Sequence, residues 1–228
     1  MHKFKAAFQD AYDAITQAGY TPPYSDFLLR KVDDEFQGYL HDRPVGSGLY
    51  YALFAEFIRR AEVKTVVELG NREGAGILAM YTGMKANTNH DNIHLYTIDT
   101  VRNLRFVPKE VLEDRNVYYI FGDVLKPSVY RLFSDKKIDM LFCDTIHTRK
   151  QLQSEWAIYK QYLSEEAIVF VDDILLADKK KAFDAIGQES LEDTRLHSSG
   201  FGIAFYEKEK DVNSKHYFWD ALHIRLRK

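Results

Sequence analysis

Residues 63–76, VKTVVELGNREGAG, decide the fold class of this chain. The first part, 63–69, is a short β-branched run that suits a strand buried on both faces of a parallel sheet. Gly70, Gly74 and Gly76 follow at once. Glycine permits positive φ angles and lets the backbone approach a ligand closely. The segment therefore predicts a strand, then a glycine loop, then the start of a helix.

The pattern of a short apolar run followed by a helical segment repeats along the middle of the chain. The further runs occupy residues 92–100, 116–124, 137–145 and 166–174. The segments between them have helical spacing, and the last of these, 150–163, is expected to place on one face Leu152, Trp156, Tyr159 and Leu163. This alternation predicts right-handed βαβ units and hence an α/β fold with a parallel sheet.

The elements outside this alternation are expected to differ. Residues 3–18 and 48–61 have the spacing of amphipathic helices, and residues 179–186 predict another helix. Residues 194–199 and 200–208 are predicted to form an antiparallel pair of strands at one edge, because glycines accompany the turn.

The composition excludes several classes of protein. The chain has 228 residues, 46% hydrophobic and 29% charged, as in ordinary soluble globular proteins. Lys and Arg total 31 against 34 Asp and Glu, and the net charge of −3 disfavours a nucleic-acid partner. The single cysteine, Cys143, can form neither an internal disulfide nor a cysteine-based zinc site. No apolar run suits a signal peptide or a membrane span, so we expect a cytoplasmic protein with no membrane partner.

Acidic side chains lie at the ends of all the predicted parallel strands. They are Glu68, Asp99, Asp123, Asp144, Asp172 and Asp173. The carboxyl ends of parallel strands share one edge of a sheet, where open α/β folds bind their ligands. Like charges gathered there repel one another, so the pattern favours a polar or cationic ligand. Three carboxylates, those of Asp144, Asp172 and Asp173, favour a hard cation such as Mg²⁺.

The glycine loop does not match two familiar phosphate-binding patterns. A dinucleotide loop, G-x-G-x-x-G, fails because position 72 is Arg. A P-loop fails because no Gly-Lys-Ser/Thr follows the strand. A nicotinamide-dependent enzyme is therefore disfavoured.

The sequence E-L-G-x-x-x-G after the first strand resembles the first motif of the class I S-adenosylmethionine-dependent methyltransferases. The resemblance implies a Rossmann-like seven-stranded sheet in the order 3-2-1-4-5-7-6, with strand seven antiparallel. It also implies that Asp99 holds the ribose hydroxyls and that Asp123 faces the adenine amino group. The full set of residues expected at the cofactor is Glu68, Gly70, Asn71, Gly74, Asp99, Asp123 and Asp144.

The second half resembles the metal-dependent O-methyltransferases, such as the catechol, macrolide-sugar and cephalosporin-hydroxylase-like enzymes. In that group an Asp after strand four and an acidic pair after strand five hold a divalent ion, which here implies Asp144, Asp172 and Asp173. His147 follows in D-x-x-H, and its usual pKa of about 6.5 would let it take a hydroxyl proton at neutral pH. Catalysis is thus expected at Asp144 and His147, on a hydroxyl of a small molecule or a sugar.

This resemblance covers roughly residues 48–207 and does not cover the N-terminal helices or the tail. We expect three parts of the chain. Residues 1–62 would form a helical cap that shapes the substrate pocket, 63–210 the cofactor-binding domain, and 211–228 a tail packed on that domain. Candidates for the acceptor wall are Tyr20, Tyr24, Tyr50 and Tyr51. The sequence leaves the oligomeric state open, and a homo-oligomer is compatible with it.

Several alternatives stay open at this point. Asp172 and Asp173 could cap the next helix, and His147 could be a surface or capping residue. TPPY at 21–24 predicts a loop, and KKK at 179–181 predicts a solvated helix face. The function could also be metal-independent methyl transfer or cofactor binding without catalysis. An iron hydroxylase is disfavoured because one histidine, not two, lies at these predicted strand ends.

Overall fold

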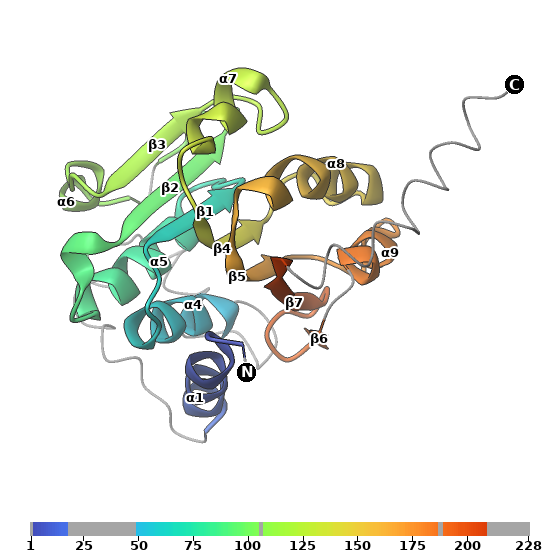
Figure 1. Ribbon diagram of the computed structural model, residues 1–228, viewed down its shortest axis with the longest axis horizontal. Helices are drawn as coiled ribbons and strands as arrows, with labels where there is room; N and C mark the ends of the chain where they lie inside the picture. The colour runs from blue at the N-terminus through green and yellow to red at the C-terminus, as the bar shows by residue number, and fades with distance from the viewer. Residues whose placement is uncertain (1, 18–48, 105–106, 187–188, 209–228) are drawn as a thin grey trace, which may run out of the picture.

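The computed structural model describes residues 2–17, 49–104, 107–186 and 189–208. Its seven-stranded sheet has the order β3-β2-β1-β4-β5-β7-β6, which confirms the predicted architecture (Figure 1). The strands are β1 (Thr65–Leu69), β2 (His94–Asp99), β3 (Val117–Phe121), β4 (Ile138–Cys143), β5 (Leu163–Val171), β6 (Glu189–Asp193) and β7 (Phe201–Glu207). β1 to β5 run parallel, whereas β7 pairs antiparallel with β5 and β6.

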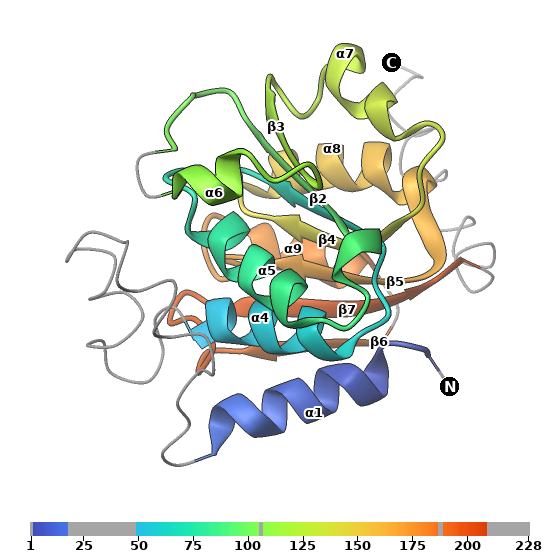
Figure 2. The ribbon, with the colours of Figure 1, turned by 90° about the vertical axis from the view of Figure 1, so that its left-hand side faces the viewer.

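Helices cover both faces of the sheet (Figure 2). One face packs against α1 (Lys5–Thr16), α4 (Leu49–Arg60), α5 (Ala75–Ala86) and α6 (Lys109–Leu112). The other face packs against α7 (Pro127–Tyr130), α8 (Arg149–Tyr159) and α9 (Lys179–Phe183). Short 3₁₀ turns occupy His90–Asn92, Arg131–Phe133, Lys160–Tyr162 and Asp184–Ile186. The arrangement is a three-layer sandwich, with a separate hydrophobic core on each side of the sheet.

The two cores explain why the central strands are mostly apolar. Every residue of β4 is buried, with Phe142 in the core under α4 and α5 and Leu141 in the core under α8. Burying an apolar side chain of this size stabilises the fold by roughly 1.5–3 kcal/mol. Strands covered on both faces therefore need no polar alternation.

The predicted strand at 194–199 is wrong. The edge strand is β6, Glu189–Asp193, and residues 194–199 form the turn that leads into β7. β6 escaped the sequence pattern because it is an exposed edge strand with charged residues and little apolar alternation. Natural sheets often carry charges on such edges, since charges discourage pairing with other chains.

Two helix predictions also need correction. Leu163, expected on the face of one helix, is instead the first residue of β5, because α8 ends at Tyr159. Lys179 is 1% exposed, so the predicted solvated face holds for the neighbouring Lys181 and fails for Lys179. Its ammonium donates a 2.7 Å hydrogen bond to the backbone carbonyl of Asp172.

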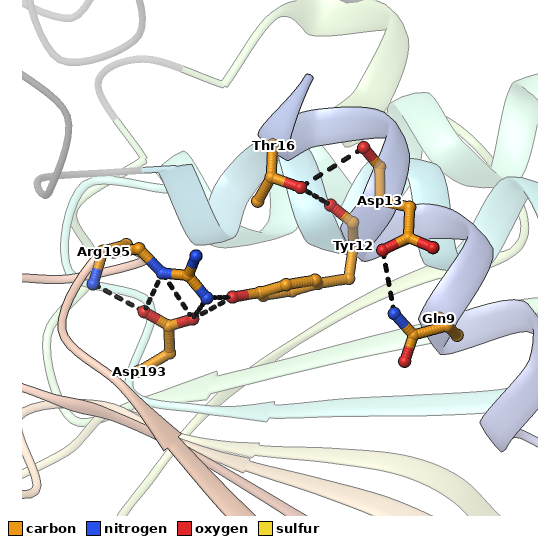
Figure 3. A network of polar contacts seen from close by, with 6 residues as sticks. All are labelled: Gln9, Tyr12, Asp13, Thr16, Asp193 and Arg195. Carbon is orange, nitrogen blue, oxygen red and sulfur yellow. Dashed lines mark hydrogen bonds and ion pairs between the residues drawn. The ribbon is translucent and has the colours of Figure 1, made fainter. Parts of the chain in front are cut away.

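The described N-terminal residues pack on the sheet edge and on α4. His2 shares a hydrogen bond with the carbonyl of Tyr206 in β7, and Tyr12 of α1 donates to Asp193 at the end of β6 (Figure 3). The TPPY segment, Tyr20 and Tyr24 and the tail from 211 lie outside the described residues. Among the helices described, none is long and apolar enough to cross a membrane.

Candidate functional site

A cavity of about 1170 Å³ opens at the carboxyl ends of the parallel strands. Its walls come from the loops after β1, β2, β3, β4 and β5, from the start of α4 and from the turn before β7. The predicted site residues that line it are Glu68, Gly70, Asn71, Asp99, Asp123, Asp144, His147, Asp172 and Asp173. Gly74 lies one residue before the lining residue Ala75, at the start of α5. The structure thus gathers the predicted residues at one edge, as the strand-end argument requires.

The glycine loop is folded tightly against the ends of β2 and β4. Gly70 has φ +86°, and a Cβ there would stand 2.2 Å from the carbonyl oxygen of Asp144, so only glycine fits. The Asp99 carboxylate accepts 3.0 Å hydrogen bonds from the backbone amides of Asn71 and Arg72. Asp99 therefore fixes the loop, whatever else it binds, and its predicted contact with a ribose stays a prediction.

Glu68 is buried beneath this loop. Its carboxylate accepts a hydrogen bond from Thr97 of β2, and Gly76 of α5 lies against it so closely that a Cβ would overlap it. Burial raises the pKa of Glu68 to about 8. The side-chain oxygen of Asn71 is also buried and has no hydrogen-bond partner among the described residues. The loop thus offers a buried acid and an unpaired acceptor toward whatever fills the cavity.

His147 bridges two carboxylates. Its Nδ1 lies 2.6 Å from Asp173 and its Nε2 lies 3.4 Å from Asp144. The hydrogen bonds to Asp144 and Asp173 raise the pKa of His147 to about 9. The expected pKa near 6.5 is therefore wrong for this arrangement, and His147 is cationic at neutral pH. Its role as a base stays a prediction, and it would require its carboxylate partners to be neutralised first.

Asp172, Asp173 and His197 form a tight group beside this bridge. One ligand atom of each residue lies within 4.8 Å of the others. Burial, with the charges of Asp144 and Asp173, raises the pKa of Asp172. Burial also lowers the pKa of His197, although the charges of Asp173 and Asp144 act to raise it. The Oδ1 atoms of Asp172 and Asp173 are buried and unpartnered among the described residues, so this donor set fits a divalent cation.

Tyr50 and Tyr51 form the wall of the cavity next to this group. The Tyr50 ring stacks on Phe201 with centroids 4.9 Å apart and meets the His197 ring edge-on at 5.5 Å. Burial raises the pKa of both tyrosines, which keeps them neutral. Of the described residues before 63, these two alone line the cavity. That residues 1–62 form a helical cap that shapes the substrate pocket stays a prediction.

The helix-capping alternatives do not hold. α9 begins at Lys179, six residues after Asp173, and α8 is capped by Thr148, which accepts from the amide of Gln151. His147 instead contacts the two carboxylates. These contacts favour a functional role for His147, Asp172 and Asp173 over helix capping.

Sequence reasoning missed two residues at this site, His197 and Lys179. His197 lies in the segment 194–199, which the sequence pattern predicts to be a strand. Because His197 lies beside Asp172 and Asp173, the site has two histidines and not the one predicted. Lys179 belongs to a run of three lysines, a pattern that favours a solvated helix face. A signal was present for His197, because a histidine followed by Ser-Ser-Gly stands just before the antiparallel strand.

Comparisons with known proteins agree with this architecture. Residues 67–174 match a family model described as a methyltransferase domain. A Podospora anserina methyltransferase bound to S-adenosylhomocysteine is 15% identical, with a TM-score of 0.58, covering 89% of this chain and 95% of its own. A Bacillus cereus O-methyltransferase, also bound to S-adenosylhomocysteine, is 12% identical, with a TM-score of 0.54, covering 81% and 95%. No curated protein sequence matches the chain.

The family match over residues 67–174 and the strand order point to one class. Together with the glycine loop after β1, they support a class I S-adenosylmethionine-dependent methyltransferase. At identities of 12–15%, the solved structures show the likeness of fold alone.

Proposed function

We propose that this methyltransferase transfers the methyl group of S-adenosylmethionine to a hydroxyl oxygen, with the help of a divalent cation. One observation carries the proposal: the group of Asp172, Asp173 and His197 opens into the same cavity as the glycine loop. A methyl donor on the loop and a cation at the acidic group would then face each other across one space. Positioning two reactants in this way supplies much of the rate of a transfer reaction.

The cofactor would lie along the ends of β1, β2 and β3. Gly70 allows close approach of the loop backbone, and Asp99 holds that backbone in place. Asp123 lines the cavity after β3, where it would face the adenine. The buried Glu68, the unpaired oxygen of Asn71 and the turn at Gly74 complete the proposed cofactor site.

The cation would be held by Asp172 and Asp173, with Asp144 beside them. A divalent cation at this place lowers the pKa of a bound hydroxyl and orients its oxygen. His147 holds a proton between Asp144 and Asp173, and Tyr50 and Tyr51 exclude water from one side of the space. These residues would fix the acceptor in line with the methyl group.

The acceptor is proposed to be a small molecule or a sugar. A structural neighbour, the TDP-rhamnose 3'-O-methyltransferase CalS11, is 12% identical, with a TM-score of 0.50, covering 78% of this chain and 82% of its own. The activity of that enzyme makes a sugar hydroxyl one reasonable acceptor to screen. The net charge of −3 still disfavours nucleic acid, and a cytoplasmic location remains part of the proposal.

Calorimetric titration of S-adenosylhomocysteine into the full-length protein tests this function. We expect saturable binding by the wild type, weaker binding by Asp123→Ala, and unchanged nucleoside binding by Asp172→Asn. A second titration with MnCl₂ or MgCl₂ should show a cation site in the wild type that Asp172→Asn loses. Asp184→Asn, at an exposed aspartate just after α9 that pairs with Lys180, serves as the matched control. Absence of nucleoside binding at millimolar ligand would contradict the proposed function.

A further inference from the structure

Three atoms that carry lone pairs converge where the β5 loop meets the turn before β7. Nδ1 of His197 lies 3.4 Å from Oδ1 of Asp173 and 3.7 Å from Oδ1 of Asp172. Both carboxylates are buried, at 4% and 7% exposure, and neither Oδ1 has a hydrogen-bond partner among the described residues. Two buried carboxylate oxygens that face one another without a partner are costly unless a proton or a cation lies between them.

Hydrogen bonds around this group show which lone pairs face its centre. The amide of Ser199 donates a long hydrogen bond, 3.3 Å, to Nδ1 of His197, and a cation bound at this nitrogen would replace that hydrogen bond, because an imidazole nitrogen has a single lone pair. The other oxygen of Asp173 is already bonded to His147 at 2.6 Å. The centre of the group is therefore lined by the Oδ1 atoms of Asp172 and Asp173 and by the imidazole nitrogen of His197.

The turn that carries His197 is held firmly against the loop that carries the two aspartates. The amides of Ile174 and Leu175 donate 3.0 Å hydrogen bonds to the carbonyls of Gly200 and Ser199. Gly200 has φ +80°, and a Cβ there would meet the Leu175 side chain at 2.6 Å. This close backbone pairing places His197 opposite the aspartates before any ligand binds.

The beginning of the same turn is tied to the N-terminal helix (Figure 3). Asp193 accepts a 2.7 Å hydrogen bond from the amide of Arg195 and contacts its guanidinium at 2.8 Å. The hydroxyl of Tyr12 in α1 contacts both side chains. Leu196, between this network and His197, is fully buried. Both ends of the turn are thus anchored, which suits a preorganised ligand.

We propose that His197 supplies a nitrogen ligand to the cation held by Asp172 and Asp173, and that this site therefore takes a transition metal such as Mn²⁺ in preference to Mg²⁺. The inference rests on the divalent cation of the proposed function and refines its identity. Mg²⁺ is bound through oxygen, whereas first-row transition metals also bind imidazole. Among these metals Mn²⁺ accepts carboxylate oxygens as Mg²⁺ does, which suits a site of two carboxylates and one imidazole. A mixed set of two carboxylates and one imidazole therefore selects against Mg²⁺, the ion that three aspartates would have favoured.

The test measures metal affinity and needs no methyl acceptor. Full-length protein, stripped with EDTA and dialysed, is titrated calorimetrically with MnCl₂ and, separately, with MgCl₂. We expect the wild type to bind Mn²⁺ more tightly than Mg²⁺. His197→Ala should weaken Mn²⁺ binding by at least about tenfold, since even indirect partners of a metal contribute that much. His90→Ala, which changes a half-exposed histidine on a surface turn, is the matched control and should bind as the wild type does.

A variant that replaces the nitrogen ligand by an oxygen ligand sharpens the result. His197→Asp replaces nitrogen by a carboxylate oxygen and should reduce the preference for Mn²⁺ over Mg²⁺, while still binding a divalent cation. Equal binding of Mn²⁺ by the wild type and His197→Ala would overturn the inference, and so would a wild type that prefers Mg²⁺.

Nucleoside binding separates this inference from the proposed function. Each variant is titrated with S-adenosylhomocysteine, and retained binding shows that the fold and cofactor site are intact. If the wild type binds both S-adenosylhomocysteine and a cation, but His197 variants leave cation affinity unchanged, the inference fails and the proposed function stands. If no divalent cation binds while the nucleoside does, the inference fails together with the metal-assisted part of the function, and metal-independent methyl transfer remains.

Discussion

Replacing Lys179 by methionine is expected to destabilise the protein by about 2–4 kcal/mol. Lys179 is 1% exposed, and its ammonium donates a 2.7 Å hydrogen bond to the carbonyl of Asp172. Methionine keeps much of the length and apolar volume of the side chain but removes the donor and the positive charge. The carbonyl of Asp172 would then be buried without a partner, and Glu155 and Asp172 would lose a nearby cation.

Denaturant unfolding of the full-length protein measures this effect. Lys181→Met on the same helix is the control, because Lys181 is exposed and pairs with Asp178 at 3.0 Å on the surface. Exposed pairs of this kind contribute about 0–1 kcal/mol. A Lys179 variant as stable as the Lys181 variant would show that the buried hydrogen bond does not support the β5 loop.

The stability of the metal-free protein is expected to fall as the pH rises from about 4.5 to 8, and Glu68→Gln should remove a large part of this fall. Burial raises the pKa of Glu68 to about 8 from its ordinary value of 4.5. Between these values the folded protein binds a proton that the unfolded chain has released. The stabilisation is therefore complete below pH 4.5 and is lost as the pH rises toward the folded pKa.

The size of this effect follows from linkage. Between the unfolded and the folded pKa, each pH unit changes the free energy of unfolding by up to about 1.4 kcal/mol. From pH 4.5 to pH 8, the free energy of unfolding of Glu68→Gln should therefore rise relative to that of the wild type by on the order of 3–4 kcal/mol. Glutamine still presents an oxygen to the hydroxyl of Thr97 but cannot ionise.

Chemical denaturation in EDTA at several pH values checks the prediction. Glu62→Gln, at an exposed glutamate before β1, should keep the pH dependence of the wild type. Parallel curves for the wild type and Glu68→Gln would contradict the role given to the burial of Glu68.

The sheet was predictable because its physical cause is local. Strands buried on both faces must be mostly apolar, and β4, apart from Asp139, and the part of β5 from Ala167 to Val171 meet this condition. β6 does not, since an exposed edge strand has no apolar face to bury. The prediction of a strand at 194–199 is wrong for this reason, because these residues form a turn and the edge strand comes before them.

The candidate site was predictable to the same degree. Asp144, Asp172 and Asp173 were found because parallel strands end at one edge, a consequence of strand direction alone. The protonation state of His147 could not be predicted from the sequence, because the pKa of an imidazole depends on its distance from charged partners. The hydrogen bonds to Asp144 and Asp173 raise the pKa of His147 to about 9, which makes the imidazole a cation at neutral pH.

The sequence by itself determined the parallel strands, the glycine loop after β1 and the acids that follow each strand. The tertiary structure alone decided that His197 joins them. β7 is antiparallel, with Gly202 opposite Val171, so its first residue lies at the edge where β5 ends. The turn before an antiparallel strand thus meets the loop after its parallel neighbour, a closeness that no spacing along the chain reveals. Lys179 is buried for a similar reason: the packing of α9 under the sheet turns one lysine of three inward.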